Sequence, residues 1–201
     1  MPVMTAPPPQ NGAKPRRLSP VKCIALILLT LIVIVGITIL VIWLAVKPRK
    51  PIYSIENASL HGYNMTKNDH LYGNFNFTLK AFNTNSRVSI YYDSFEVKLF
   101  YNSQQIAFNN VEPFFQPRRN VTYLDLFLPA KDVALYGDVA RDLKTERTAG
   151  AVEMEIKVRA KIRFKVGIWK SSHRKLKLLC KPMVPVSSTK SSQTTTCHLD
   201  L

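Results

Sequence analysis

The chain has 201 residues, a formal net charge of +15 at pH 7 and a pI of about 9.9. The part of the chain that follows residue 46 has the length of one domain. A positive charge of this size ordinarily indicates a polyanionic partner, with nucleic acid as the usual example.

Residues 1–22 are predicted to form a disordered tail. They include Pro7-Pro8-Pro9, four basic residues, no acidic residue and almost nothing apolar. A segment of this composition cannot bury a core, so we expect disorder with some polyproline II character. Its charges favour the anionic cytoplasmic leaflet of a membrane.

Residues 23–46 contain no charged side chain. A helix of this length reaches about 36 Å and can cross a hydrocarbon core of about 30 Å. The alternatives are a cleavable signal peptide, whose apolar run is usually about 7–15 residues, and a buried core helix. The run is longer than that and ends at Trp43-Leu44-Ala45-Val46 without an Ala-x-Ala pattern. We therefore predict a retained transmembrane signal-anchor helix.

Cys23 stands at the N-terminal edge of this helix. A cytosolic thiol in this position is a possible palmitoylation site. The alternative is a small apolar residue at the membrane interface, and the sequence leaves both readings open.

The side of the membrane on which the body lies is indicated by N-glycosylation sequons. Basic residues flank both ends of the anchor in similar numbers, so the positive-inside rule does not decide the orientation. Four N-x-S/T sequons follow the anchor and none precedes it, namely those of Asn57, Asn64, Asn76 and Asn120. We predict a type II membrane protein with a cytosolic tail and an extracellular C-terminal domain.

This location changes the expected partner. After the anchor, the chain has 24 basic and 13 acidic residues. Outside the cell, nucleic acid is a poor candidate, whereas acidic polysaccharide or a membrane surface matches the charge. Signalling or immune membrane proteins are further candidate partners.

Alternating apolar residues predict β-strands in the body. Residues 47–70 are expected to be a juxtamembrane segment with a first strand, and residues 71–182 an antiparallel sandwich. The residues predicted to share an inward face are Leu71, Phe75, Phe77, Leu79 and Ala81, then Phe95, Val97, Leu99 and Tyr101, then Thr122, Leu124, Leu126 and Leu128.

A longer strand is predicted over residues 152–168. Its inward residues are Ile156, Val158, Ala160, Ile162, Phe164, Val166 and Ile168. The opposite face carries five cations at about 6.6 Å spacing, which we call the basic ridge: Lys157, Arg159, Lys161, Arg163 and Lys165. The ridge serves either solubility and protection of a sheet edge or the binding of a polyanion.

Residues 130–147 break the alternation. Val133, Tyr136, Ala140 and Leu143 recur at spacings of three and four, which predicts an amphipathic helix despite Gly137. Several short strands with one helical connection predict a mainly β fold, an antiparallel β-sandwich after a single transmembrane helix.

Two cysteines lie near the C-terminus. Cys180 and Cys197 are separated by 16 residues and are predicted to form a disulfide in an oxidising compartment. A metal site with Cys197, His198 and His173 is the alternative, but the spacing is not that of a zinc motif. Residues 183–201 are expected to be a flexible tail.

The chain resembles the plant NHL family, the harpin-induced-like and non-race-specific-disease-resistance-like membrane proteins with a late-embryogenesis-abundant group-2 domain. The resemblance rests on the basic Pro-rich tail, the single anchor, the late cysteine pair and three blocks: Phe82-Asn83-Thr84-Asn85, Tyr91-Tyr92-Asp93 and residues 111–117 (VEPFFQP). The family's Asn-Pro-Asn is Asn83-Thr84-Asn85 in this chain. The resemblance implies a plant plasma-membrane protein linked to defence and stress, with a sandwich resembling fibronectin type III.

No sequence motif indicates catalysis. The chain has no Gly-x-Ser-x-Gly elbow, phosphate-binding loop or metal-binding helix, so we expect neither an enzyme nor a cofactor. The leading hypothesis is a membrane-anchored interaction protein in plant defence signalling or in adhesion between cell wall and plasma membrane. The alternative is a stress-protection protein that contacts lipid through the same basic ridge.

Overall fold

The computed structural model describes residues 20–46, 49–186 and 193–200. The chain divides into two compact units, residues 1–47 and residues 48–201, which are described separately below. The predicted tail at residues 1–22 lies outside the described residues except for residues 20–22, which are helical.

The first unit contains α1 (Pro20–Val46), which begins three residues before the predicted start. Proline is accepted in the first helical turn because its missing N–H has no partner there. The hydroxyls of Thr30 and Thr38 donate to the carbonyls of Leu26 and Ile34, at 2.8 Å and 2.7 Å. These bonds satisfy the two hydroxyl groups among the described side chains of α1. By length and composition, α1 is able to cross a membrane.

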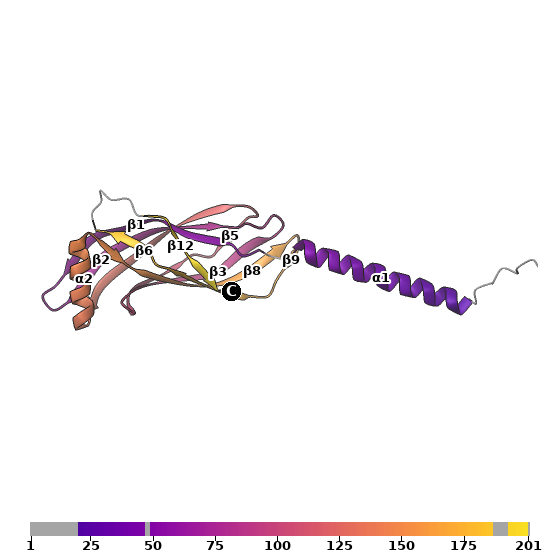
Figure 1. The fold of residues 1–201 in the computed structure, drawn as a ribbon, viewed down its shortest axis with the longest axis horizontal. Coiled ribbons are helices and arrows are strands. Elements are labelled where there is room, and N and C mark those ends of the chain that lie inside the picture. The colour runs from indigo at the N-terminus through magenta and orange to yellow at the C-terminus, as the bar shows by residue number, and fades with distance from the viewer. Residues whose placement is uncertain (1–19, 47–48, 187–192, 201) are drawn as a thin grey trace, which may run out of the picture. The chain divides into compact units, whose positions relative to one another are not determined.

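The second unit has two main sheets, in which all pairings are antiparallel (Figure 1). Sheet A has the order β12-β1-β2-β6. Its strands are β1 (Ile52–Met65), β2 (His70–Phe82), β6 (Val121–Ala134) and β12 (Thr195–Thr196).

Sheet B has the order β13-β10-β8-β3-β4, with β5 paired to β3 and β9 paired to β8. Its strands are β3 (Ser89–Tyr101), β4 (Gln104–Val111), β5 (Phe114–Gln116), β8 (Glu155–Val166), β9 (Trp169–Lys170), β10 (Arg174–Cys180) and β13 (His198–Asp200). A small third sheet pairs β7 (Ala151–Glu153) with β11 (Met183–Pro185).

One hydrophobic core fills the space between the sheets and confirms the predicted mainly β sandwich. The inward residues predicted for β2 and β3 are all buried, among them Phe75 and Leu99. On β6, Leu126 and Leu128 are buried, while Thr122 and Leu124 are half-buried near the strand's start. The alternating pattern therefore identified the core faces of these strands.

The prediction of a helix over residues 130–147 is wrong at its start. Residues 130–134 continue β6, with Val133 opposite Leu71 and Ala134 opposite His70. The helix is α2 (Gly137–Ala149), which lies at one end of the sandwich (Figure 1). Tyr136 is its N-cap and is exposed, so only Ala140 and Leu143 bury the predicted face.

The strand predicted over residues 152–168 is interrupted at Met154 and ends at Val166. Met154 separates β7 from β8, and its N–H donates to the carbonyl of Pro182 rather than to a strand. The prediction that Ile168 faces the core is wrong, because its side chain is 90% exposed. Gly167 has a φ of 56° and starts the turn into β9, so the alternation ends at Val166.

The domain limits differ at both ends from those expected. β1 pairs with β2 along most of its length, so the sandwich begins at residue 52 rather than 71. Within residues 183–201, which were expected to be a flexible tail, the described part contains β11, β12 and β13. β12 pairs with β1 in sheet A, and β13 pairs with β10 in sheet B.

A buried polar network occupies the end of the sandwich opposite α2. The hydroxyls of Tyr53 and Tyr92 are 2.6 Å apart, and Tyr92 donates to Oε1 of Gln116 at 3.1 Å. Gln116 Nε2 in turn donates to the carbonyl of Ala81 at 2.8 Å. Burial is the main cause that raises the pKa of both tyrosines. The VEPFFQP block is therefore a structural element at this end.

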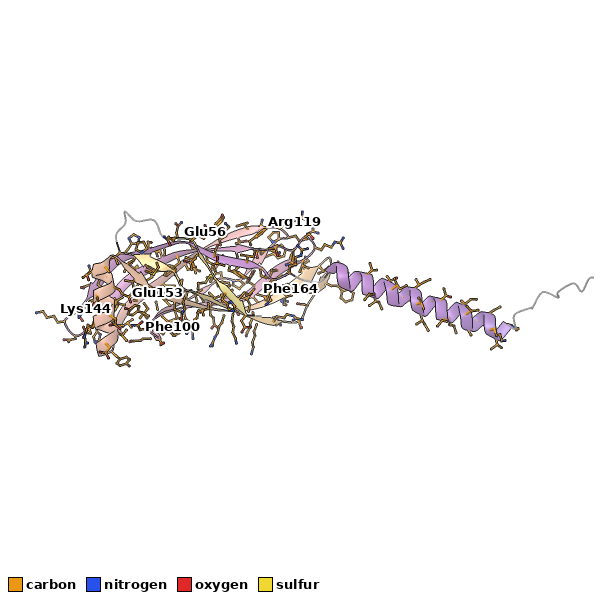
Figure 2. The ribbon with its side chains drawn as sticks, viewed as in Figure 1. Glu56, Phe100, Arg119, Lys144, Glu153 and Phe164 are labelled. Carbon is orange, nitrogen blue, oxygen red and sulfur yellow. A yellow bond between two sulfur atoms is a disulfide. The ribbon has the colours of Figure 1, made fainter. Side chains whose placement is uncertain are left out.

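The same end fixes the chain that enters β1. Asn85 accepts a hydrogen bond from the N–H of Arg49 at 2.6 Å and donates one to its carbonyl at 2.8 Å. Figure 2 shows Arg119 toward this end and Lys144 on α2 at the opposite end. The N–H of Arg119 donates to the carbonyl of Asn85, so three loops meet there.

Candidate functional site

The basic ridge lies on the outer face of sheet B. Lys157, Arg159 and Lys161 are exposed, while Arg163 and Lys165 are half-buried. The intervening residues on β8 point into the core, as the period of two requires. The structure therefore places all five predicted cations on one side of one strand.

The register of sheet B adds two cations that the sequence analysis missed. Lys175 of β10 lies directly opposite Lys161, and Lys177 lies directly opposite Arg159. The alternation of Lys175-Leu176-Lys177-Leu178 was a usable signal for a strand with a basic face, but only the register shows which ridge residues these lysines face. The basic face of sheet B is thus two strands wide.

The cations of this face repel one another. Residues directly opposite in an antiparallel pair have Cβ atoms about 4.5–5.5 Å apart, and like charges there are destabilising. Besides the two pairs above, Lys98 of β3 lies opposite Lys157. An anion that binds here would remove this repulsion.

Acidic neighbours neutralise only part of the face. Lys157 pairs with Glu155 at 2.6 Å, and Lys177 lies 3.9 Å from Asp200. Among the described residues, Arg159, Lys161 and Lys175 form no ion pair within 4.0 Å. Glu96, which lies opposite Arg159, is the one acidic residue among the described residues that line a groove of about 300 Å³ with these three cations.

Arg163 forms an ion pair that the sequence did not indicate. Its guanidinium donates two hydrogen bonds to Asp93, from Nε at 2.8 Å and from Nη2. These hydrogen bonds are the main cause that lowers the pKa of Asp93 and raises that of Arg163. His173 Nε2 is also 3.5 Å from Asp93. Arg163 is therefore a structural member of the ridge.

Lys165 belongs to an aromatic cluster. The rings of Tyr91 and Phe115 have centroids 4.6 Å apart, and Lys165 lies 5.8 Å and 5.9 Å from them. Lys170 of β9 lies 4.7 Å from the Tyr91 ring. Cation–π contacts of this kind hold an ammonium group at a surface while leaving it in contact with water.

The predicted glycosylation sites are on other parts of the sandwich. Asn57 and Asn64 are exposed on β1, Asn76 is half-buried on β2, and Asn120 is exposed just before β6. These positions belong to the strands of sheet A or to the loop that leads into it. Glycans at these asparagines would therefore leave the basic face of sheet B uncovered.

The structure joins Cys180 and Cys197 in a disulfide with a Cα–Cα distance of 4.4 Å. Within the part of the chain that the structure describes, no group of three or more His, Cys, Asp or Glu residues is arranged to hold a metal ion. Cys23 lies on α1 as a free thiol.

Comparison with known proteins gives consistent similarities. A family model described as late embryogenesis abundant protein matches residues 78–180. An uncharacterized Arabidopsis thaliana protein, At1g08160, is 35% identical over 176 residues, which cover 87% of this chain and 80% of that protein.

Two further Arabidopsis thaliana relatives carry a family name. NDR1/HIN1-like protein 3 is 32% identical over 87% of this chain and 78% of its own length. NDR1/HIN1-like protein 10 is 31% identical over 85% of this chain and 76% of its own length. These shares exceed residues 48–201, so the similarity extends into the unit that contains α1.

Proposed function

Because the chain belongs to the late embryogenesis abundant protein family and is similar along most of its length to NDR1/HIN1-like proteins, we propose that it is a non-catalytic, membrane-anchored interaction protein of plant defence or stress. Its basic face would bind an acidic partner, with acidic cell-wall polysaccharide as our choice. This contact would connect wall and plasma membrane.

One observation carries the choice of ligand class. Lys161 and Lys175 lie directly opposite each other, beside Arg159, and none of the three has an ion-pair partner among the described residues. Like charges directly opposite each other in a sheet are destabilising, so this arrangement favours a ligand with several negative charges. The groove of about 300 Å³ between them is open to such a chain.

A triple variant tests the proposal. Replacing Arg159, Lys161 and Lys175 by glutamine is expected to weaken retention on immobilised acidic polysaccharide roughly tenfold, since exposed ion pairs contribute about 0.2–1 kcal/mol each. Retention of the unmodified protein should fall as salt rises, because salt screens exposed charges. The measurement is the salt concentration at which the full-length protein elutes.

The matched control is Lys67→Gln, Lys131→Gln and Arg141→Gln, which removes the same charge from exposed positions outside sheet B. Equal losses in both variants would show that only net charge matters and would contradict a site. Loss of binding to anionic vesicles, with polysaccharide retention unchanged, would favour the alternative role in contacting lipid.

The proposed topology places the tail in the cytosol and the sandwich outside the cell. It is supported by α1 and by the four sequons that follow it. In sealed microsomes, a C-terminal tag is expected to survive protease until detergent is added. Digestion of the tag without detergent would place the sandwich in the cytosol and remove the basis for wall binding.

A further inference from the structure

The tip of the β8–β9 hairpin exposes two large apolar side chains. Ile168 is 90% exposed and Trp169 is 78% exposed, immediately after the turn at Gly167. Single exposed apolar residues are ordinary on a protein surface, but an adjacent pair at the end of a hairpin forms a continuous exposed apolar surface.

Basic residues surround this point. Lys165 and Lys170 lie directly opposite each other at the base of the hairpin. Lys165 also lines a surface depression of about 440 Å³ with Arg87, Arg118 and Ser89. None of the described residues that line this depression is acidic. We call this surface the basic–apolar tip; its members are Ile168, Trp169, Lys165, Lys170, Arg87 and Arg118.

The chemistry of the tip matches the surface of a lipid bilayer. Tryptophan is favoured at the level of the headgroups, where its ring is apolar and its N–H is hydrated. Lysine and arginine beside it extend to the lipid phosphates, and each cation near an anionic surface raises binding about fivefold. A depression lined by three cations and a hydroxyl is suited to a phosphate group.

The short connection between α1 and β1 limits how far this end of the sandwich can lie from a membrane that α1 crosses. β1 starts at Ile52, opposite Phe82, and Arg49 is held by Asn85 in the loop that leads to β3. β3 starts at Ser89, opposite Lys165, so the hairpin tip and the start of β1 share one end. Residues 47–51 separate α1 from β1 and span at most about 20 Å when fully extended.

We propose that the basic–apolar tip docks on the bilayer that α1 crosses, with Ile168 and Trp169 among the headgroups and the surrounding cations on lipid phosphates. The inference rests on the proposed membrane anchoring. Docking would fix the sandwich relative to the membrane and direct the far end of the basic ridge, at Lys157, away from it. The ridge then remains accessible to a partner.

The chain supplies its own probe for the test. It has two tryptophans, so Trp43→Phe leaves Trp169 as the single one. Full-length Trp43→Phe protein is reconstituted at a low protein-to-lipid ratio into vesicles of phosphatidylcholine with an anionic phospholipid. We expect Trp169 emission at shorter wavelength than in a water-exposed indole, quenching by spin-labelled lipids with shallow labels, and protection from aqueous acrylamide.

A second variant and a control distinguish the effect of the tip's own cations from that of net charge. Adding Lys165→Gln, Lys170→Gln and Arg118→Gln should release Trp169 to acrylamide, whereas Lys67→Gln, Lys131→Gln and Arg141→Gln should not. Vesicle-bound protein whose Trp169 is accessible to acrylamide and unquenched by lipid labels would overturn the docking. Protein that alkaline carbonate extracts from the vesicles would instead refute the anchoring itself.

Discussion

Replacing Phe75 by alanine is expected to lower the free energy of unfolding of the sandwich by about 3–5 kcal/mol. Phe75 is fully buried in the centre of β2, directly opposite Leu60 of β1 and Leu128 of β6. Removing the ring costs its transfer free energy and leaves a cavity that the surrounding strands fill only in part. Chemical denaturation of the full-length protein in detergent, followed by far-ultraviolet circular dichroism, measures the loss.

The matched control is Phe127→Ala on β6. Phe127 is 50% exposed and lies opposite Asn76, on the outer face of sheet A. Surface substitutions away from special features usually change stability by about 0.5 kcal/mol or less. If Phe75→Ala and Phe127→Ala destabilised equally, the assignment of inner and outer faces would be wrong for this sheet.

The faces of the long strands were predictable because their pattern is local. In β2 and β3, the period of two depends only on residues within each strand, so the pattern identified the buried residues from Leu71 to Ala81 and from Phe95 to Tyr101. The same rule failed at Ile168, where the turn at Gly167 ends the strand. It also failed for residues 130–134, whose spacing fits a helix but whose backbone pairs with β2.

The shortest strands gave no usable pattern. β12 has two residues and β13 has three, and alternation cannot be recognised over so few positions. Both form because other strands offer free edges, which is a property of the assembled sheets. The sequence therefore led to the expectation of a flexible tail where the structure has edge strands.

The candidate-site residues within one strand were predictable, but their contacts with residues of other strands were not. The five ridge residues follow from alternation in β8, whereas the opposition of Lys161 and Lys175 depends on the register between β8 and β10. The pairing of Arg163 with Asp93 joins residues 70 positions apart. Such contacts decide which cations lack an acidic partner, and they depend on residues that are far apart in the sequence.

Replacing both Cys180 and Cys197 by alanine is expected to lower the free energy of unfolding by about 2–5 kcal/mol. The two residues are 17 positions apart, and the chain-entropy model gives about 3 kcal/mol for a loop of that size. Cys180 ends β10, and Cys197 lies between β12 and β13. The disulfide thus fixes a segment that is otherwise held by two very short strands.

The loss should be concentrated in residues 193–200. The N–H of Cys197 donates to the carbonyl of Tyr53 at 3.0 Å, so this segment contacts sheet A through β12 and sheet B through β13. Without the disulfide, we expect faster hydrogen exchange in residues 193–200 and in their partners on β1, together with a lower denaturation midpoint. Unchanged exchange and an unchanged midpoint would show that the short strands suffice.

Cys23→Ala is the control, because Cys23 is a free thiol in the other unit and its replacement should leave the sandwich unaffected.

The redox state of Cys180 and Cys197 also tests on which side of the membrane the sandwich lies. Disulfides persist in oxidising compartments and are rare in the cytosol. Thiol labelling of protein isolated from plant cells should therefore leave Cys180 and Cys197 unmodified. Labelling of these two residues would place the sandwich on the reducing side of the membrane, where it would lack this source of stability.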